Sequence, residues 1–122
     1  MDEAREKSNG LSRIIGEQLS AVCFVMDYLQ LQFNGCLLTV LTRLTVICND
    51  HSYSSEAAGY RDLLCERITQ KVCEVVLSPE KLSIIFEDDA RFDISLKEEN
   101  YIGAEAIHFH FPEAENMPII II

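Results

Sequence analysis

Apolar residues recur at every second position over much of this chain. Leu29, Leu31 and Phe33 alternate with polar neighbours, and the same alternation returns in segments 36–48, 82–87, 91–96 and 105–111. Successive side chains of an extended chain point to opposite faces, so a period of two places the apolar residues of a segment on one side. The pattern predicts antiparallel β-strands that bury one face and expose the other to water.

Turn signals separate these segments. Asn34-Gly35 tolerates positive φ at both positions, so it predicts a β-hairpin between a long strand over 20–33 and a return strand over 36–48. The long strand is apolar on both faces before Asp27, which predicts cover on both sides or a β-bulge at that point. Two further turns are predicted at Ser78–Lys81 and Asp88-Asp89.

Helical spacing is convincing in one segment, residues 57–71. Its apolar stripe consists of Tyr60, Leu64 and Ile68, joined by Ala57 and Leu63. Ser54 or Ser55 can cap the N-terminus of this helix. The side chains that we expect to face water are Arg61, Asp62, Glu66 and Arg67.

The elements follow one another in the order ββ-α-ββββ. This order predicts an α+β domain in which a curved antiparallel sheet of about six strands packs on one helix. A chain of 122 residues has room for one hydrophobic core. We expect residues 1–10 to form a mobile tail and residues 11–122 to form a single domain.

Charge limits the classes of partner. The chain has 10 basic and 20 acidic residues and a net charge of −10, of which residues 74–122 carry −8. Such a surface repels phosphate, which disfavours nucleic acid and anionic membranes. It attracts a basic protein, although acidity also serves solubility alone. No cofactor is predicted.

The five cysteines indicate the redox compartment. Their number is odd and no pair has CxxC spacing, so neither a disulfide framework nor a zinc ribbon is predicted. The first ten residues are charged, and no apolar run reaches the length of a membrane-spanning helix. We therefore expect a cytoplasmic protein with reduced thiols.

Histidines provide the candidate metal ligands. His108 and His110 lie two apart on a predicted strand, so their side chains point the same way and could bind one metal ion. A third ligand must come from elsewhere, such as His51 or an acid among residues 87–89. The alternative is that His108 and His110 form the polar face opposite Ile107 and Phe109.

Two other groups are candidates for reactive or pocket positions. Asp50-His51 lies in the polar segment 49–59, which we expect to be a loop, and Cys48 or Cys65 could act as a nucleophile beside it. Solvation of the loop is the alternative, and no complete catalytic set is predicted. Asp27 would lie on a half-buried strand, where it either anchors the chain locally or lines a pocket.

Two surfaces are candidates for protein contacts. The first is an acidic patch within 87–99, comprising Glu87, Asp88, Asp89, Asp93, Glu98 and Glu99. The second consists of the last four residues, Ile119, Ile120, Ile121 and Ile122. Exposed β-branched residues at a chain end promote aggregation. The isoleucines must therefore pair with the protein's own sheet or with the edge of a second copy in a homodimer.

The segments FVMDYLQLQFNG, AGYRDLLCERI, LSIIFEDDARFDISL and EAIHFHF, in this order, resemble a set of small uncharacterised bacterial α+β domains. The resemblance covers residues 16–111. It implies the order of elements and a bacterial cytoplasmic origin, and it carries no activity or functional residue. Those domains have glycine at the hairpin tip where this chain has EDDA.

Three hypotheses of function follow. The first is a non-enzymatic protein-interaction domain, for example an acidic inhibitor or immunity-type partner of a basic protein. The second is a small-molecule- or metal-binding enzyme that uses His51, His108, His110 or Asp27. The third is a structural homodimer.

Overall fold

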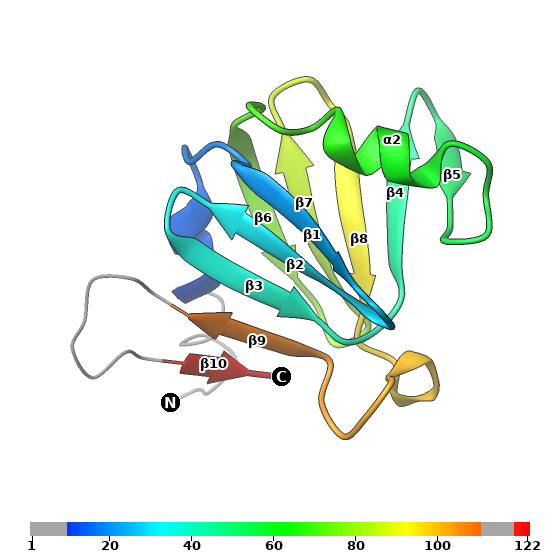
Figure 1. Ribbon diagram of the computed structural model, residues 1–122. Coiled ribbons are helices and arrows are strands. Elements are labelled where there is room, and N and C mark those ends of the chain that lie inside the picture. The colour runs from blue at the N-terminus through cyan, green and yellow to red at the C-terminus, as the bar shows by residue number, and fades with distance from the viewer. Residues whose placement is uncertain (1–9, 111–118) are drawn as a thin grey trace.

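The computed structural model describes residues 10–110 and 119–122 and consists mostly of antiparallel sheet with one short α-helix (Figure 1). Sheet 1 has the strand order β1-β2-β3-β9-β10, and sheet 2 has the order β5-β4-β8-β7-β6. In sheet 1 the strands are β1 (Ala21–Val25), β2 (Tyr28–Phe33), β3 (Cys36–Val40), β9 (Ile107–His110) and β10 (Ile119–Ile121). In sheet 2 they are β4 (Leu44–Cys48), β5 (His51–Tyr53), β6 (Val72–Leu77), β7 (Lys81–Phe86) and β8 (Arg91–Ser95). Residues 1–9 of the predicted tail lie outside the described residues.

The predicted single sheet of about six strands is wrong, because the chain forms two five-stranded sheets that pack face to face. The predicted strand over 36–48 divides at residues 41–43, where the chain crosses from sheet 1 to sheet 2. Val40 before the crossing and Leu44 after it are both buried, and Thr42 between them is 9% exposed. The alternation of buried and exposed residues therefore runs through the crossing without interruption. For this reason the sequence pattern predicted one continuous strand.

The predicted strand over 20–33 also divides. Val25 pairs with Tyr28, so Met26 and Asp27 form a two-residue turn between β1 and β2. Met26 has a φ of 37° and its side chain is fully exposed. The predicted bulge near Asp27 is thus a hairpin turn, and the strand β1 that precedes it contacts α2.

Two more hairpins depend on paired residues with positive φ. Asn34 and Gly35 have φ values of 52° and 103° and join β2 to β3, which confirms the predicted turn. Asn49 and Asp50 have φ values of 53° and 65° and join β4 to β5. The prediction of a loop over 49–59 is wrong for His51–Tyr53, which adds a short edge strand.

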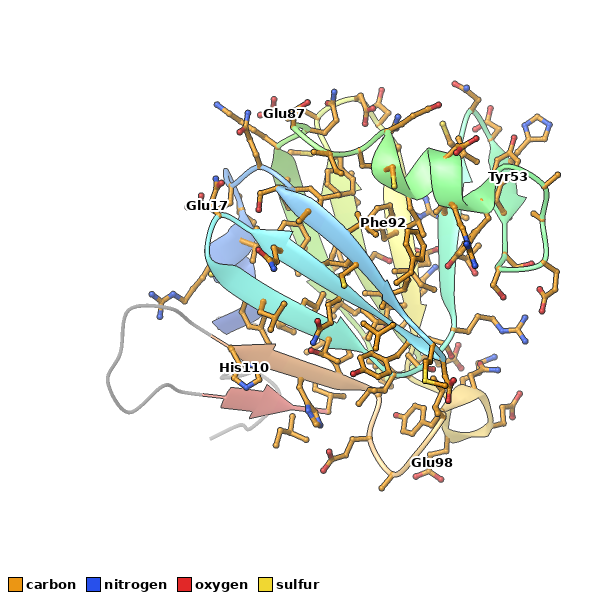
Figure 2. All side chains as sticks on the ribbon, in the orientation of Figure 1. Glu17, Tyr53, Glu87, Phe92, Glu98 and His110 are labelled. Atoms are coloured by element: carbon orange, nitrogen blue, oxygen red, sulfur yellow. The ribbon has the colours of Figure 1, made fainter. Side chains whose placement is uncertain are left out.

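The core lies between the two sheets. Phe33 and Phe109 from sheet 1 meet Phe86 and Phe92 from sheet 2, and all four are fully buried. Figure 2 shows Phe92 pointing between the sheets. The rings of Phe86 and Phe92 meet edge to face with centroids 4.9 Å apart. Such a pair adds about 0.5–1.5 kcal/mol beyond the burial of its area.

Short helices cover the openings between the sheets. The α-helix α2 (Tyr60–Cys65) contacts both β1 and β4, and it buries Tyr60 and Leu64 as predicted. It is shorter than the predicted 57–71 at both ends. Gly59, with a φ of 83°, is its N-cap in place of Ser54 or Ser55, and the helix ends at Cys65. The 3-10 helix η1 (Ser12–Ile14) contacts β6 and buries Ile14.

Arg67, which we expected to face water, is 8% exposed. Its guanidinium forms an ion pair of 2.7 Å with Asp88. This contact joins the segment after α2 to the β7–β8 hairpin. Within the described part of the chain, none of the helices combines the length and the apolar character needed to cross a bilayer.

Candidate functional site

The predicted reactive groups lie on separate parts of the fold. Asp27 is exposed in the β1–β2 turn of sheet 1. His51 is exposed on β5 at the edge of sheet 2, where its Nδ1 lies 2.8 Å from the carbonyl oxygen of Asn49. Cys48 pairs with His51 in register but packs against the core, and Cys65 is exposed on α2. Cys48 and His51 are therefore cross-strand neighbours, whereas Asp27 and Cys65 lie on other elements.

His108 and His110 lie on the outer face of sheet 1, opposite the buried Ile107 and Phe109, as the alternation predicts. The Nε2 atom of His108 lies 2.6 Å from Glu105 Oε1. The Nδ1 atom of His110 is buried, and no described residue forms a hydrogen bond to it. Among residues 10–110 and 119–122, no three His, Cys, Asp or Glu side chains form a group that could hold a metal ion.

The acids within 87–99 do not form one patch. Figure 2 shows Glu87 and Glu98 at opposite ends of the molecule, because the strand β8 runs between them. Asp88 pairs with Arg67 and accepts a hydrogen bond from the backbone N–H of Ala90 at 3.2 Å. Asp88 is therefore part of the hairpin structure although it is exposed, and the exposed acids form two groups, Glu87, Asp88 and Asp89 at one end and Glu98 and Glu99 at the other.

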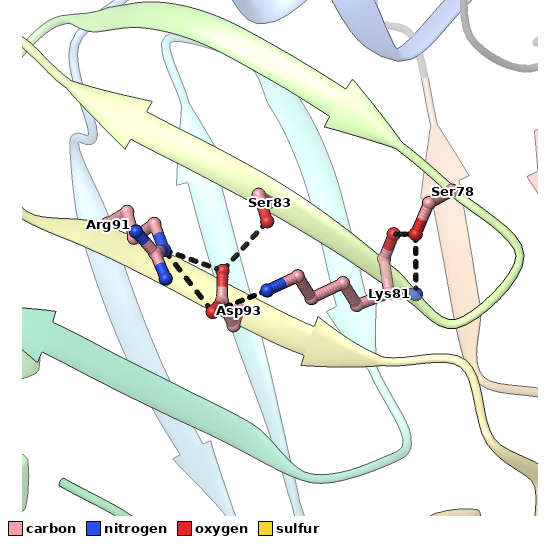
Figure 3. Close-up of polar contacts among 5 residues, drawn as sticks. All are labelled: Ser78, Lys81, Ser83, Arg91 and Asp93. Carbon is pink, nitrogen blue, oxygen red and sulfur yellow. Dashed lines mark hydrogen bonds and ion pairs between the residues drawn. The ribbon is translucent and has the colours of Figure 1, made fainter. Parts of the chain in front are cut away.

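Asp93 has its charge balanced within sheet 2 (Figure 3). Its Oδ1 accepts a hydrogen bond of 2.7 Å from the Ser83 hydroxyl, and Arg91 Nε donates to the same atom at 3.1 Å. Lys81 Nζ donates to Oδ2 at 3.2 Å. Burial alone raises the pKa of Asp93, but these hydrogen bonds outweigh it and hold the pKa below its usual value.

The final isoleucines pair with their own chain. In register, Ile119 lies opposite His110 and Ile121 lies opposite His108, so β10 extends sheet 1. Ile122 also exchanges backbone hydrogen bonds with Ile107, at 3.0 and 3.2 Å. Of the two alternatives for the tail, the structure therefore has the pairing within one chain.

A hollow is lined by residues of the β1–β2 turn, the crossing between β3 and β4, the start of α2, and the segment at the 3-10 helix η2 (Glu98–Asn100). We call it the crossover pocket and define it by Phe24, Met26, Arg43, Arg61, Asn100 and Ile102. Its volume is about 340 Å³. Asp27 lies on its rim, whereas His51 and His108 do not line it.

Apolar side chains of this pocket are unusually accessible. Met26 is 100% exposed, Ile102 is 50% exposed and Phe24 is 39% exposed. These are three of the six large apolar side chains that are exposed among the described residues. Isolated exposed apolar residues are ordinary, but their clustering around one hollow is typical of a binding surface.

Cationic groups lie beside these apolar residues. The guanidinium carbon of Arg61 lies 5.2 Å from the ring centroid of Phe24, a cation–π distance. Arg43 is exposed at the crossing. The pocket thus combines two guanidinium groups with an apolar floor and rim, in a protein whose net charge is −10.

Hydrogen bonds hold the walls of the pocket in place. The Tyr60 hydroxyl donates to the carbonyl of Leu44 at 2.7 Å and ties α2 to the crossing. The Thr42 hydroxyl donates to the carbonyl of Asn100 at 3.1 Å, and the backbone N–H of Ile102 donates to Leu41 at 2.9 Å. Sequence reasoning missed this pocket, apart from Asp27, because four separate segments build it.

No protein-family model matched the sequence, and searches of curated proteins and of solved structures found no significant match.

Proposed function

We propose that this protein is a non-enzymatic protein-interaction domain and that the crossover pocket is its recognition site. The clustering of Phe24, Met26 and Ile102 around one hollow carries this proposal. A partner that covers these side chains releases water from their apolar surface, and each Å² of apolar surface covered stabilises the complex by roughly 25 cal/mol. The methionine suits such a role because its flexible thioether adapts to the shape of a partner.

The placement of the titratable groups supports binding rather than chemistry. Asp27, His51 and His108 belong to three different surfaces, and of these three groups only Asp27 lines the crossover pocket. General acid–base catalysis needs groups within hydrogen-bonding distance of the reacting atoms. The pocket offers apolar area and guanidinium groups, which recognise a ligand without transforming it.

Photo-crosslinking tests the proposal. A photoreactive residue in place of Met26 should yield a discrete adduct with a cellular protein, whereas the same residue in place of Val76 should not. Val76 is the matched control because it is 43% exposed and lies on β6, outside the pocket. A Phe24→Ser substitution should remove the adduct. Equal crosslinking from positions 26 and 76 would overturn the proposal.

A basic protein partner is the second candidate. Glu98 and Glu99 are exposed at the end of the molecule away from the β7–β8 hairpin, and the net charge of −10 would speed the approach of a cationic surface. Binding of this kind weakens as salt rises. A salt titration of the complex tests this candidate, because an affinity that does not change with ionic strength excludes electrostatic binding of a basic partner.

A cytoplasmic location belongs to the same proposal. All five cysteines are free thiols, and Cys23, Cys65 and Cys73 are exposed. Exposed thiols persist in a reducing compartment. Localisation of a tagged protein tests this inference.

A further inference from the structure

The exposed rim limits what can occupy the crossover pocket. A small molecule that filled about 340 Å³ would sit in the hollow. It would leave much of Met26 uncovered, because this side chain projects from the turn and is fully exposed. A segment of polypeptide that passes over the hollow covers both the floor and the rim. The occupant suited to this shape is therefore longer than the pocket itself.

The charges of the lining limit the chemistry of that segment. Arg43 and Arg61 face the pocket against one carboxylate, that of Asp27. Glu56 is a further acid near Arg43. The hydrogen bond from the Ser54 hydroxyl, with a smaller contribution from the charge of Arg43, lowers the pKa of the Glu56 carboxyl. The Arg61 guanidinium lies over the Phe24 ring, with 5.2 Å between its carbon and the ring centroid, and this contact favours one orientation of the group. An oriented guanidinium donates charge-assisted hydrogen bonds to a carboxylate more readily than a mobile lysine does.

We propose that the crossover pocket binds an acidic–apolar peptide segment of another protein. Its large apolar side chain fills the hollow between Phe24, Leu29 and Ile102, and a neighbouring carboxylate pairs with Arg61 and Arg43. This inference rests on the proposed function and specifies the partner. It also reverses the expectation from net charge, because the two arginines make the site locally attractive to acids although the protein as a whole is acidic.

The anchored walls favour tight recognition. Thr42 and Leu41 hold the segment that carries Ile102, and Tyr60 holds the start of α2 that carries Arg61. A site held in its binding geometry loses little conformational entropy when the ligand arrives. The fully exposed side chain of Met26 and the exposed side chains of Arg43 and Arg61 must become ordered.

Selection from a random peptide library tests the inference. Peptides enriched on the full-length protein should combine a large apolar residue with Asp or Glu. Arg61→Gln should weaken their binding roughly tenfold or more, because it removes a charge-assisted hydrogen bond. Lys71→Gln is the matched control: it removes one positive charge at an exposed position outside the pocket, and it should leave the affinity unchanged.

Met26→Ser separates the two proposals. If enriched peptides lack acids, or if Lys71→Gln weakens binding as much as Arg61→Gln does, the acidic–apolar inference is overturned. The proposed function survives that result when Met26→Ser still weakens binding. Both proposals are overturned if Met26→Ser leaves the affinity for the enriched peptides unchanged, or if the selection enriches no peptide. A dimer in sedimentation velocity that Met26→Ser dissolves would show that a second copy fills the pocket, which also overturns the peptide inference.

Discussion

At the scale of single residues, Asp93 is the charged side chain most dependent on its neighbours. Its carboxylate is 14% exposed and accepts hydrogen bonds from Ser83, Arg91 and Lys81. The folded state therefore holds the pKa below the value in the unfolded chain. A lowered carboxyl pKa stabilises the fold above about pH 4, and this contribution is lost as the pH falls through the folded pKa.

We therefore expect Asp93→Asn to lower the free energy of unfolding at neutral pH by about 1.5–3 kcal/mol, the range for hydrogen bonds to a charged group. The difference from the parent protein should shrink as the pH falls below about 4. Urea denaturation at several pH values measures it. Asp89→Asn is the control, because position 89 is exposed and asparagine tolerates its φ of 74°. A difference independent of pH would contradict the prediction.

The pKa of Tyr60 is shifted upward in the folded state, whereas that of Asp93 is shifted downward. Its hydroxyl is buried against the Leu44 carbonyl, and burial, assisted by the charge of Glu56, raises its pKa to about 12. Because the raised pKa belongs to the folded state, the contribution of Tyr60 to stability is fully present below about pH 10. This contribution is lost as the pH rises through the pKa of the folded state.

Replacing Tyr60 with phenylalanine should cost about 1–3 kcal/mol, since the carbonyl of Leu44 loses its side-chain donor. A late phase should also vanish from the alkaline titration of tyrosinate absorbance. Tyr53→Phe is the control, because Tyr53 lies on the edge strand β5. Identical alkaline titrations of the parent and Tyr60→Phe proteins would refute this account.

At the scale of elements, the C-terminal strand β10 determines whether the tail promotes dimerisation. The structure pairs it with β9 of the same chain, and Ile122 packs against the core. A chain that ends at Pro118 should unfold at a lower denaturant concentration, because it loses these hydrogen bonds and exposes the edge of β9. The mass of each protein in solution should show that the truncated chain has the same oligomeric state as the full chain. A dimer that becomes a monomer on truncation would instead show that the tail joins two copies.

The hairpins, strands and helix show how much of the fold could be predicted from the sequence. Asn34-Gly35 predicted its hairpin because two adjacent positive φ values demand such residues. The strands β8 and β9 also lie within their predicted segments, whereas β7 begins at Lys81, one residue before its predicted segment 82–87. The division at Met26 and Asp27 was missed because methionine is not a typical turn residue and the segments on both sides continue the strand pattern. The helix α2 was predicted too long because its apolar stripe continues to Ile68, whereas Thr69 already has a φ of 86°.

At the scale of the whole molecule, burial divides the five thiols into classes. Cys23, Cys65 and Cys73 are exposed, Cys48 is partly buried and Cys36 is buried. Burial raises the pKa of the Cys36 thiol, so its nucleophilic thiolate is scarce. Pulsed alkylation followed by mass spectrometry should label the three exposed cysteines first and Cys36 last. Equal labelling rates in the native protein would contradict this order, and labelling in denaturant serves as the control.

The candidate site belongs to this scale, which explains why the sequence concealed it. Phe24, Arg43, Arg61 and Ile102 come from four segments, and only the packing of two sheets with α2 brings them together. The acids at 87–99 show the converse effect. They are neighbours in the sequence, but an extended strand carries them apart at about 3.3 Å per residue. Asp88 and Asp93 pair with basic residues that the sequence did not identify as their partners.

The uninterrupted alternation through residues 41–43 has a consequence for how such a chain can evolve. Val40, Thr42 and Leu44 all turn inward, so both sheets share one odd–even register. Inserting a single amino acid there would exchange inner and outer faces for every strand that follows until a loop restored the phase. Inserting two would preserve it. Length variation at this junction should therefore be tolerated in steps of two, a periodicity ordinarily associated with strands rather than with the connections between them.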